Sequence, residues 1–434
     1  MLIRFSLINN NVNNNIKMKN LLLLALLIFS VNIFAQVNTP AIGTDYLDQT
    51  YYALEDGSMT SNPHTDWDIA FNVTAGSAGV LVNEGTGLSF MTTYPEVGLY
   101  FNNATDFATA DTTGISKIYN PEVEWSTGAF NSVSSGSPLD LGWGDYNTTT
   151  HAINGTRIFF IKLRTDVYKK VEIQSLIAGA YTFRYADLDG SNEVIQTIDK
   201  ANYTGKTLAY FSIENEIALD LEPTHWDLLF TRYYTDLDNN GISIDYLVTG
   251  VLQNNGVEVA QADNITPTTV DYTNYTTEYR DTLTIIGHDW KGFDFQLGWV
   301  IEANQVFFVK TATDSIWKVQ FYDFEGTSTG KTTLEKTFET ALVSTSSVYQ
   351  SLESFNVYPN PVTDHVNIAF ELATDNRNAI IEIYNTVGQN VLSQSINVNN
   401  GFNIKHLPID LVSGTYYLTL KVDNEVITKP IFVK

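Results

Sequence analysis

The sequence predicts an all-β protein in which two repeated antiparallel β modules are followed by a small C-terminal β-sandwich. Three observations support this prediction. Aromatic residues are abundant (24 Tyr, 24 Phe and 7 Trp) while charged residues make up only 17% of the chain, and this mixture favours strands and turns. No stretch of the middle region has a convincing 3.6-residue apolar period. A comparison of the chain with itself finds two related units.

The N-terminal segment, residues 1–35, is predicted to be a cleavable secretory signal. Lys17 and Lys19 precede a short apolar run over 21–34, and a small residue closes it. A basic flank followed by an apolar run that is short for a membrane span is typical of such signals. Met18 is an alternative start site. A retained membrane anchor is the alternative interpretation, and no other segment reaches the length of a membrane span.

Composition limits what the middle of the chain can bind. The formal net charge of the 434 residues is −25, and a surface this acidic repels phosphate backbones, so nucleic acid is not an expected partner. The chain has no cysteine. This excludes disulfides, thiolate metal sites and lipid attachment at an N-terminal cysteine.

The middle of the chain is a duplication. Residues 51–71 align without gaps on residues 210–230, and both segments end in the pattern Trp-Asp-apolar-x-Phe. Residues 158–173 align on residues 306–321, again without gaps, and the offset between the copies falls from 159 to 148. Insertions therefore lie between shared strands. The predicted organisation is a β module over 36–205, a second over 206–340 and a linker over 341–353.

The shared segments have the patterns of β-strands. The run 158–162 is nearly continuously apolar, as expected for a strand covered on both faces. A polar turn over 164–166 follows, and Val171 and Ile173 then alternate with charged residues. Tryptophans that recur in both copies are interpreted as core residues rather than as a sugar-stacking platform. They are Trp67, Trp143, Trp226 and Trp299.

The composition changes near residue 354, where a tail of short strands begins. Val366, Ile368 and Phe370 alternate as a half-buried strand. Gly388 lies where a hairpin needs a positive φ. About seven short strands at this spacing predict a small sandwich over 354–434.

Four motifs follow one another in this tail: YPNP over 358–361, IYNxxGQ over 383–389, LPxDLxSGxY over 407–416 and KPIFVK over 429–434. Together they make the tail similar to the type A sorting domain of type IX secretion over nearly its whole length. The resemblance implies that an outer-membrane translocon recognises the tail, that a sorting peptidase removes it, and that the cargo stays on the cell surface or is released. The expected sorting-signal residues are Tyr358, Pro359, Asn360, Pro361, Gly388, Gly414, Lys429 and Lys434.

A second resemblance rests on the strand Trp67–Phe71, on its repeat at 226–230 followed by Thr-Arg-Tyr, and on the later strand pair of each copy. Over about residues 45–340, taken as two copies, these features resemble the HmuY-like family of haem-binding surface proteins. The resemblance implies a non-enzymatic binding protein whose members hold haem axially with two histidines, or with histidine and methionine, from loops. This chain departs from the family in lacking a cysteine for lipidation.

Haem ligation needs an unprotonated imidazole or a thioether on a loop. The candidate ligands in the middle of the chain are His151, His288, His225 and Met91. Each histidine also has a plain structural interpretation, as a surface or hydrogen-bonded residue. The sequence singles out no ligand pair.

An acidic turn suggests a different kind of site. Asp236, Asp238 and Asn240, followed by Gly241, have the spacing of a Ca²⁺ loop, although Leu247 stands where the twelfth-position glutamate is expected. A polar hairpin turn without metal is the alternative. Together with exposed aromatic residues, such turns give the alternative function, a surface adhesin or glycan-binding protein with calcium-stabilised turns.

Signatures of catalysis are missing from the sequence. It contains neither Gly-x-Ser-x-Gly nor His-Glu-x-x-His, and no thiol is present to act as a nucleophile. Acids are so abundant that a glycosidase-like pair cannot be recognised by residue type. The sequence therefore predicts a protein without enzymatic activity.

Overall fold

The computed structural model describes residues 35–87, 95–239, 241–341, 352–372, 377–399, 401–422 and 425–434. Within these ranges the chain forms β-strands and six short 3₁₀ turns and no α-helix, which confirms the all-β prediction. The 3₁₀ turns are η1 (Thr44–Tyr46), η2 (His64–Asp66), η3 (Ala129–Asn131), η4 (Lys200–Tyr203), η5 (Tyr272–Tyr275) and η6 (Gly326–Ser328).

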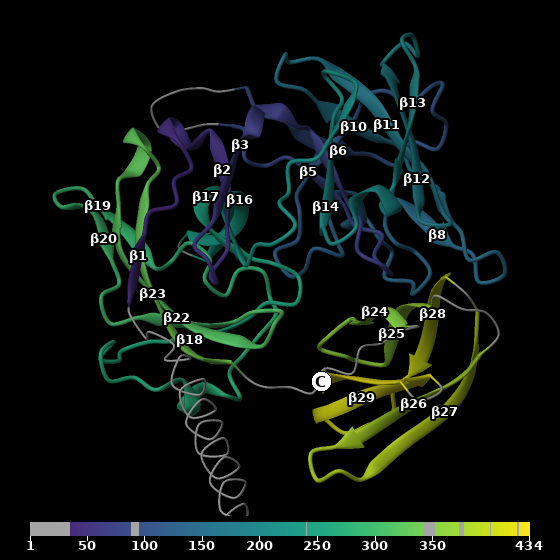
Figure 1. The fold of residues 1–434 in the computed structure, drawn as a ribbon. Helices are drawn as coiled ribbons and strands as arrows, with labels where there is room; N and C mark the ends of the chain where they lie inside the picture. The colour runs from purple at the N-terminus through teal and green to yellow at the C-terminus, as the bar shows by residue number, and fades with distance from the viewer. Residues whose placement is uncertain are drawn as a thin grey trace, which may run out of the picture.

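Each half of the middle region contains one large antiparallel sheet (Figure 1). In the first half the order is β13-β12-β11-β10-β6-β7, with the hairpin β8-β9 alongside β11. In the second half the order is β1-β23-β22-β21-β18. The first sheet comprises β6 (Gly98–Phe101), β7 (Ser116–Ile118), β8 (Gly144–Tyr146), β9 (Ile153–Gly155), β10 (Phe159–Lys162), β11 (Tyr168–Ile177), β12 (Ala180–Asp187) and β13 (Val194–Asp199). The second comprises β1 (Gln36–Asn38), β18 (Glu258–Ala262), β21 (Val306–Lys310), β22 (Ser315–Phe324) and β23 (Thr332–Ala341).

The two large sheets share an irregularity that marks them as repeats. The ladder of β11 with β12 shifts register between Ile173 and Ser175, and the ladder of β22 with β23 shifts between Phe321 and Asp323. These positions are 148 residues apart, the offset of the sequence alignment. Because a bulge bends and twists a strand, its repetition gives the two sheets the same curvature at the same place.

Strand β10 is buried on both faces, as its apolar run predicts. Phe159 and Ile161 belong to the main core of the first half, whereas Phe160 packs in a separate cluster with Phe107 and Ile158 on the other face. The loop that carries Phe107 covers this second face, so no polar residue is needed there.

Two smaller sheets are built by exchange between the halves. In one, the order is β17-β16-β2-β3; in the other it is β15-β14-β4-β5. The first-half hairpin β2-β3 thus joins second-half strands, and the second-half hairpin β14-β15 joins first-half strands. The bounds are β2 (Asp48–Tyr52), β3 (Met59–Pro63), β4 (Ile69–Asn72), β5 (Val80–Val82), β14 (Leu208–Ser212), β15 (Ile217–Leu219), β16 (Leu228–Asn239) and β17 (Ile242–Gln253). The proposed module boundary at residue 205 lies between strands that are interlocked in this way.

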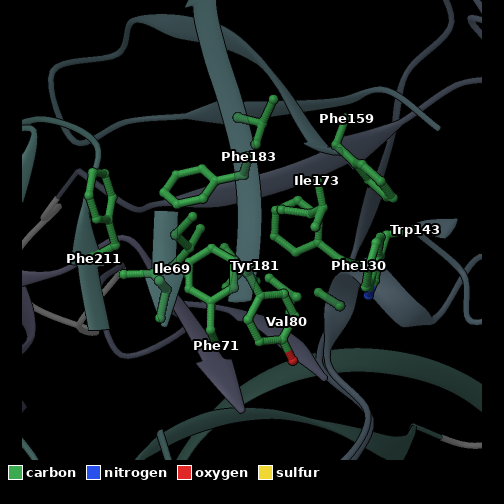
Figure 2. Packing of buried hydrophobic residues seen from close by; sticks show 14 of the residues in the cluster. Ile69, Phe71, Val80, Phe130, Trp143, Phe159, Ile173, Tyr181, Phe183 and Phe211 are labelled. Atoms are coloured by element: carbon green, nitrogen blue, oxygen red, sulfur yellow. The ribbon is translucent and has the colours of Figure 1, made fainter. Parts of the chain in front are cut away.

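The exchange carries side chains into the opposite core. Figure 2 shows Phe211 of β14 beside Ile69 and Phe183 in the first-half core, and the rings of Phe183 and Phe211 are 5.0 Å apart. Tyr52 of β2, which is equivalent to Phe211, is likewise buried in the second-half core next to Phe230. Each half therefore completes its apolar core with an aromatic residue from the other.

The tail forms the predicted small sandwich of seven strands. Its sheets have the orders β24-β25-β28 and β27-β26-β29-β30, and their facing sides enclose an apolar core. The predicted turn at Gly388 is confirmed, with a φ of 79° that suits glycine. The strands are β24 (Leu352–Tyr358), β25 (His365–Leu372), β26 (Arg377–Asn385), β27 (Asn390–Val398), β28 (Gly401–Pro408), β29 (Gly414–Val422) and β30 (Glu425–Val433).

One tail strand differs from its prediction. The segment around Val366, Ile368 and Phe370 was expected to be half-buried, but Asn367 and Ala369 on its other face are buried as well. Ala369 belongs to the core cluster of the first half of the middle region, so the outer face of β25 is covered by that region.

Candidate functional site

The exchanged strands meet around two equivalent tyrosines. Tyr51 and Tyr210 occupy the same position in the two repeats, and their hydroxyls are in hydrogen-bond contact. The ring of Tyr51 packs edge-on against Trp226 at 5.0 Å, and that of Tyr210 packs edge-on against Trp67 at 4.9 Å. The repeats thus contact each other through equivalent residues, about an approximate two-fold axis. The prediction that Trp67 and Trp226 are core residues is confirmed.

The aspartate of each Trp-Asp pattern also acts across this interface. The Asp227 carboxylate accepts a hydrogen bond from the backbone N–H of Leu54 (2.7 Å), and that of Asp68 accepts one from the backbone N–H of Glu214 (3.1 Å). Both aspartates are buried. A buried carboxylate stabilises the turn whose backbone N–H it accepts. The aspartate of the repeated Trp-Asp pattern therefore helps to hold the two halves together.

A cavity of about 70 Å³ lies between the halves, beside these tyrosines. Such a volume holds a few water molecules. It is far too small to enclose a porphyrin. Its apolar wall includes Trp67, Trp125 and Tyr210, and its polar wall includes His64, Thr231 and Tyr233.

His64 is a buried imidazole on the polar wall. Its Nε2 lies 3.4 Å from the Thr231 hydroxyl, and its Nδ1 has no hydrogen-bond partner among the described residues. Burial, reinforced by the nearby Arg232 charge, lowers the pKa of His64 to about 3. The imidazole is therefore neutral throughout the physiological range. A Cβ on Gly85 would lie 1.9 Å from its Nδ1, so only glycine fits beside this ring.

Glu84 and Arg232 complete the polar wall. The Glu84 carboxylate accepts backbone N–H groups from Asn120 (2.7 Å) and Tyr234 (3.2 Å), and burial raises its pKa to about 7. The Arg232 guanidinium donates to the backbone carbonyl of Gly85 (3.2 Å). These groups hold the segment after β5 against β16.

Beyond the cavity, β16 and β17 continue as a two-stranded ribbon with one apolar face. Register pairs Thr235 with Tyr246 and Leu237 with Ile244, paired residues lie on one face, and Ile242 follows on the same face of β17. Ile242, Ile244 and Tyr246 on this face are 66%, 37% and 53% exposed. The opposite face is acidic and carries Asp236 and Asp245.

His288 lies at the base of this apolar face. The side chain of Tyr233, two residues before Thr235, shares the face, and its hydroxyl is 3.5 Å from Nδ1 of His288. Burial lowers the pKa of His288. Burial thus favours the neutral imidazole, and a tyrosine lies at Nδ1. A hydrogen-bonding group at one nitrogen of a histidine ring orients the other nitrogen as a metal ligand.

The other predicted haem ligands have different surroundings. His151 contacts the Tyr146 hydroxyl through Nδ1 (2.7 Å) and the Asn399 amide of the tail through Nε2 (2.9 Å). His225 is exposed on the turn before β16. Met91 lies outside the described residues. Glu96, which follows that segment, accepts a hydrogen bond from the hydroxyl of Tyr234 (3.0 Å), and Tyr234 lies on the face of β16 opposite to Tyr233.

Two of the predicted calcium residues, Asp236 and Asp238, lie in the last part of β16. Asp236 is in β16, paired with Asp245, and its carboxylate accepts a hydrogen bond from the Ser243 hydroxyl. Asn240 and the side chain of Asp238 lie outside the described residues. In the part of the chain that the structure describes, no three His, Cys, Asp or Glu side chains gather as a metal ion would require. Calcium binding stays a prediction.

Several predicted sorting-signal residues come together at one end of the sandwich. Asn360 accepts a hydrogen bond from the backbone N–H of Phe432 (2.8 Å) and donates to the carbonyl of Pro430 (3.1 Å). The backbone N–H of Lys434 donates to Val362 (2.8 Å). The YPNP and KPIFVK motifs therefore bind each other. Their recognition by the export machinery stays a prediction.

Trp299 packs against the second-half core, as predicted, but it is less buried than its counterpart in the first half. In the first half, the equivalent Trp143 is fully buried and donates its indole N–H to the carbonyl of Ala78 (2.8 Å). Trp299 is only partly buried and lies in a projecting hairpin, β19 (Lys291–Asp294) with β20 (Gly298–Ile301). Phe295 and Leu297 at the turn are 95% and 78% exposed.

The sequence reasoning missed the buried polar wall of the cavity. Nothing in the neighbourhood of His64 in the sequence indicates that it is buried. The available signal was Gly85, whose role becomes clear only when η2 and the segment after β5 are adjacent in space. Nothing in the sequence of this acidic chain distinguishes Glu84 and Arg232 from the other charged residues.

Comparison with known proteins gives two family matches. The family described as secretion system C-terminal sorting domain matches residues 356–434, and the family described as HmuY protein matches residues 45–339. The sorting domain marks the chain for export to the cell surface or for secretion. No helix in the described ranges has the length and apolar character for crossing a membrane. A search of curated proteins finds no match.

Similar solved structures are remote. They include apo PinO from Porphyromonas gingivitis (9% identity, 71% of this chain and 99% of that chain, TM-score 0.25) and dimeric latent PorU from Porphyromonas gingivalis (10%, 92% and 34%, TM-score 0.19). A third is Escherichia coli alpha-2-macroglobulin (9%, 92% and 44%, TM-score 0.18). These scores carry no information about the site. The match over residues 45–339 covers more than half of the chain, and the protein therefore belongs to the HmuY family, with a type IX sorting domain at its C-terminus.

Proposed function

We propose that this exported protein is a non-enzymatic haem-binding protein, with the apolar face of the β16–β17 ribbon as the binding surface and His288 as an iron ligand. Family membership supports haem as the ligand class. The observation that carries the assignment to this surface is the position of His288 at its base, with Tyr233 at Nδ1.

The chemistry of the ribbon suits a porphyrin. Haem supplies an iron centre that accepts a nitrogen or sulfur ligand, flanked by a flat apolar macrocycle. Leu237, Ile242, Ile244 and Tyr246 form an apolar face that is exposed among the residues the structure describes, and exposed apolar patches of this kind mark interaction sites. Met91 remains the candidate for a second ligand.

The test is a haem titration of the secreted chain, followed by the Soret absorption band. We expect a Soret shift with the wild-type protein and a Kd at least tenfold higher in His288→Ala, because an axial ligand is lost. The double variant Ile242→Ser, Ile244→Ser should bind haem more weakly. The wavelength of its Soret band should match that of the wild-type complex, because the iron ligand is kept.

His225→Ala is the matched control, since His225 is exposed and lies before the start of β16, away from the residues of the apolar face. Its affinity should equal that of the wild-type protein. If the wild-type chain gives no Soret shift, haem is not the ligand. If His288→Ala binds as tightly as the wild-type chain, the ribbon surface is not the site.

A second candidate function, glycan binding, is favoured by the hairpin β19–β20. Phe293, Phe295 and Trp299 form a run of edge-packed rings, with centroid distances of 5.7 Å and 5.3 Å from Phe293 to the other two. Exposed rings beside polar groups such as Gln296 suit the mixed surface of a sugar.

A glycan array tests this candidate directly. We expect Phe295→Ala to remove any binding that the wild-type chain shows, because Phe295 is the most exposed ring. An array with chelator present separates a calcium-dependent lectin from a calcium-independent one. The absence of any bound glycan in both conditions would reject the candidate.

A further inference from the structure

The sorting domain lies beside the first half of the HmuY domain, below β8 in Figure 1, and apolar side chains join the two. Ala369 of β25 and Ile404 of β28 are buried members of the first-half core cluster, and Tyr358 and Phe402 pack against the same cluster. The ring of Phe402 meets that of Tyr146 edge-on at 5.9 Å. Four apolar side chains from three strands of one sheet thus face the HmuY domain.

Polar contacts surround this apolar centre. The Asn399 amide lies 2.9 Å from Nε2 of His151, whose other ring nitrogen contacts the Tyr146 hydroxyl at 2.7 Å. On the second half of the HmuY domain, the Arg280 guanidinium lies over the Phe432 ring at 5.9 Å. A centre of buried apolar residues with polar groups at its rim is the usual anatomy of a protein interface.

Charges across the contact are complementary. Lys200 of the HmuY domain lies within electrostatic range of Glu371 of the sorting domain, and Glu124 within range of Lys429. Burial lowers the pKa of Lys200 to about 8, and the Glu371 carboxylate opposes that shift. Opposite charges brought together from both sides fix the register of an interface.

The sorting domain does not need this contact to fold. Its strands pair only with one another within the described ranges, and its own core is enclosed between its two sheets. The outer face of β25, with Ala369, is therefore a preformed surface rather than part of the sandwich interior.

From this arrangement we infer that the HmuY domain carries a docking surface for its own sorting domain, and that the sorting domain stays bound there after the linker is cut. Severing the linker would then leave a non-covalent complex, and the tail would leave by dissociation. The imidazole of His151 is contacted by the tail until that happens.

The experiment uses the full chain with a site-specific protease sequence placed at residues 344–347. After cleavage, size-exclusion chromatography at low micromolar concentration should show both pieces in one peak. Titration calorimetry on the separated pieces then gives the Kd. Separate elution of the wild-type pieces at this concentration would overturn the inference.

Ala369→Glu tests whether the docked face is the one described, because it places a charge on the buried face without entering the sandwich core. We expect its Kd to rise at least tenfold, with an unchanged circular dichroism spectrum for the isolated sorting domain. Val387→Glu is the matched control, since Val387 is 83% exposed at the β26–β27 turn, and its Kd should not change. Equal Kd values for both variants would overturn the inference.

The contact between His151 and Asn399 allows a sharper test. Single changes to alanine at each position, and both together, form a double-mutant cycle. We expect the fold-changes in Kd to be non-additive, because each single change already removes the contact. Fully additive fold-changes would place the docked tail elsewhere on the HmuY domain.

Discussion

Replacing Trp226 by alanine should lower the free energy of unfolding by about 3–5 kcal/mol, the usual cost of removing a large buried aromatic side chain. Trp226 packs edge-on against Tyr51 and lies 6.2 Å from the ring of Trp125. Its indole N–H donates to the buried Glu222 carboxylate at 2.8 Å, so the change also removes a partner of a buried charge. The measurement is urea unfolding followed by tryptophan fluorescence and by circular dichroism.

The neighbouring residue gives the control for this experiment. His225→Ala should change the free energy of unfolding by less than about 0.5 kcal/mol, as is usual for an exposed position. Because Trp226 and Tyr51 come from different halves, we also expect the two optical probes to report one transition. Two separate transitions in the wild-type HmuY domain would contradict the exchange of hairpins.

The second large effect is a loss of stability in acid that is caused by His64. The pKa of its imidazole is about 3 in the folded chain, because of burial and the Arg232 charge, against 6.5 for an ordinary histidine. Between these values the unfolded chain binds a proton that the folded chain does not. The contribution of His64 to stability is therefore complete above pH 6.5 and falls as the pH decreases towards 3, by at most about 5 kcal/mol.

Unfolding at a series of pH values between 3 and 7 tests this effect. His64→Asn should flatten the dependence of the free energy of unfolding on pH, because asparagine does not titrate. His225→Asn is the control for the substitution itself, since position 225 is exposed. A slope that His64→Asn leaves unchanged would show that His64 is protonated in the folded chain or is not buried.

Features that depend on local pattern could be predicted from the sequence. The uninterrupted apolar run of β10 predicts burial on both faces, and Gly388 predicts the turn in which this glycine lies. The alternation at Tyr416, Leu418 and Leu420 likewise encodes one face of β29. In each case the neighbours of a residue along the chain determine its surroundings in space.

Features that depend on distant partners could not be predicted. The tripeptide Leu-Gly-Trp gives a buried tryptophan at Trp143 and a partly exposed one at Trp299, because the surrounding loops differ between the repeats. The burial of His64 depends on its contact with Gly85 across two strands. Sequence alignment showed that β2 and β14 are equivalent, but no local pattern indicates that each pairs with the other repeat.

The crossed hairpins have a consequence for how such a chain can arise. A single repeat would present a sheet with a missing hairpin and, at the same time, a free hairpin of the shape that the sheet lacks. In two identical copies, the free hairpin of each could complete the sheet of the other. Such an exchange is related by a two-fold axis, the closed symmetry that most homodimers adopt. The chain therefore has the architecture of two swapped copies joined covalently, and the Tyr51–Tyr210 contact lies where equivalent residues of the two copies meet.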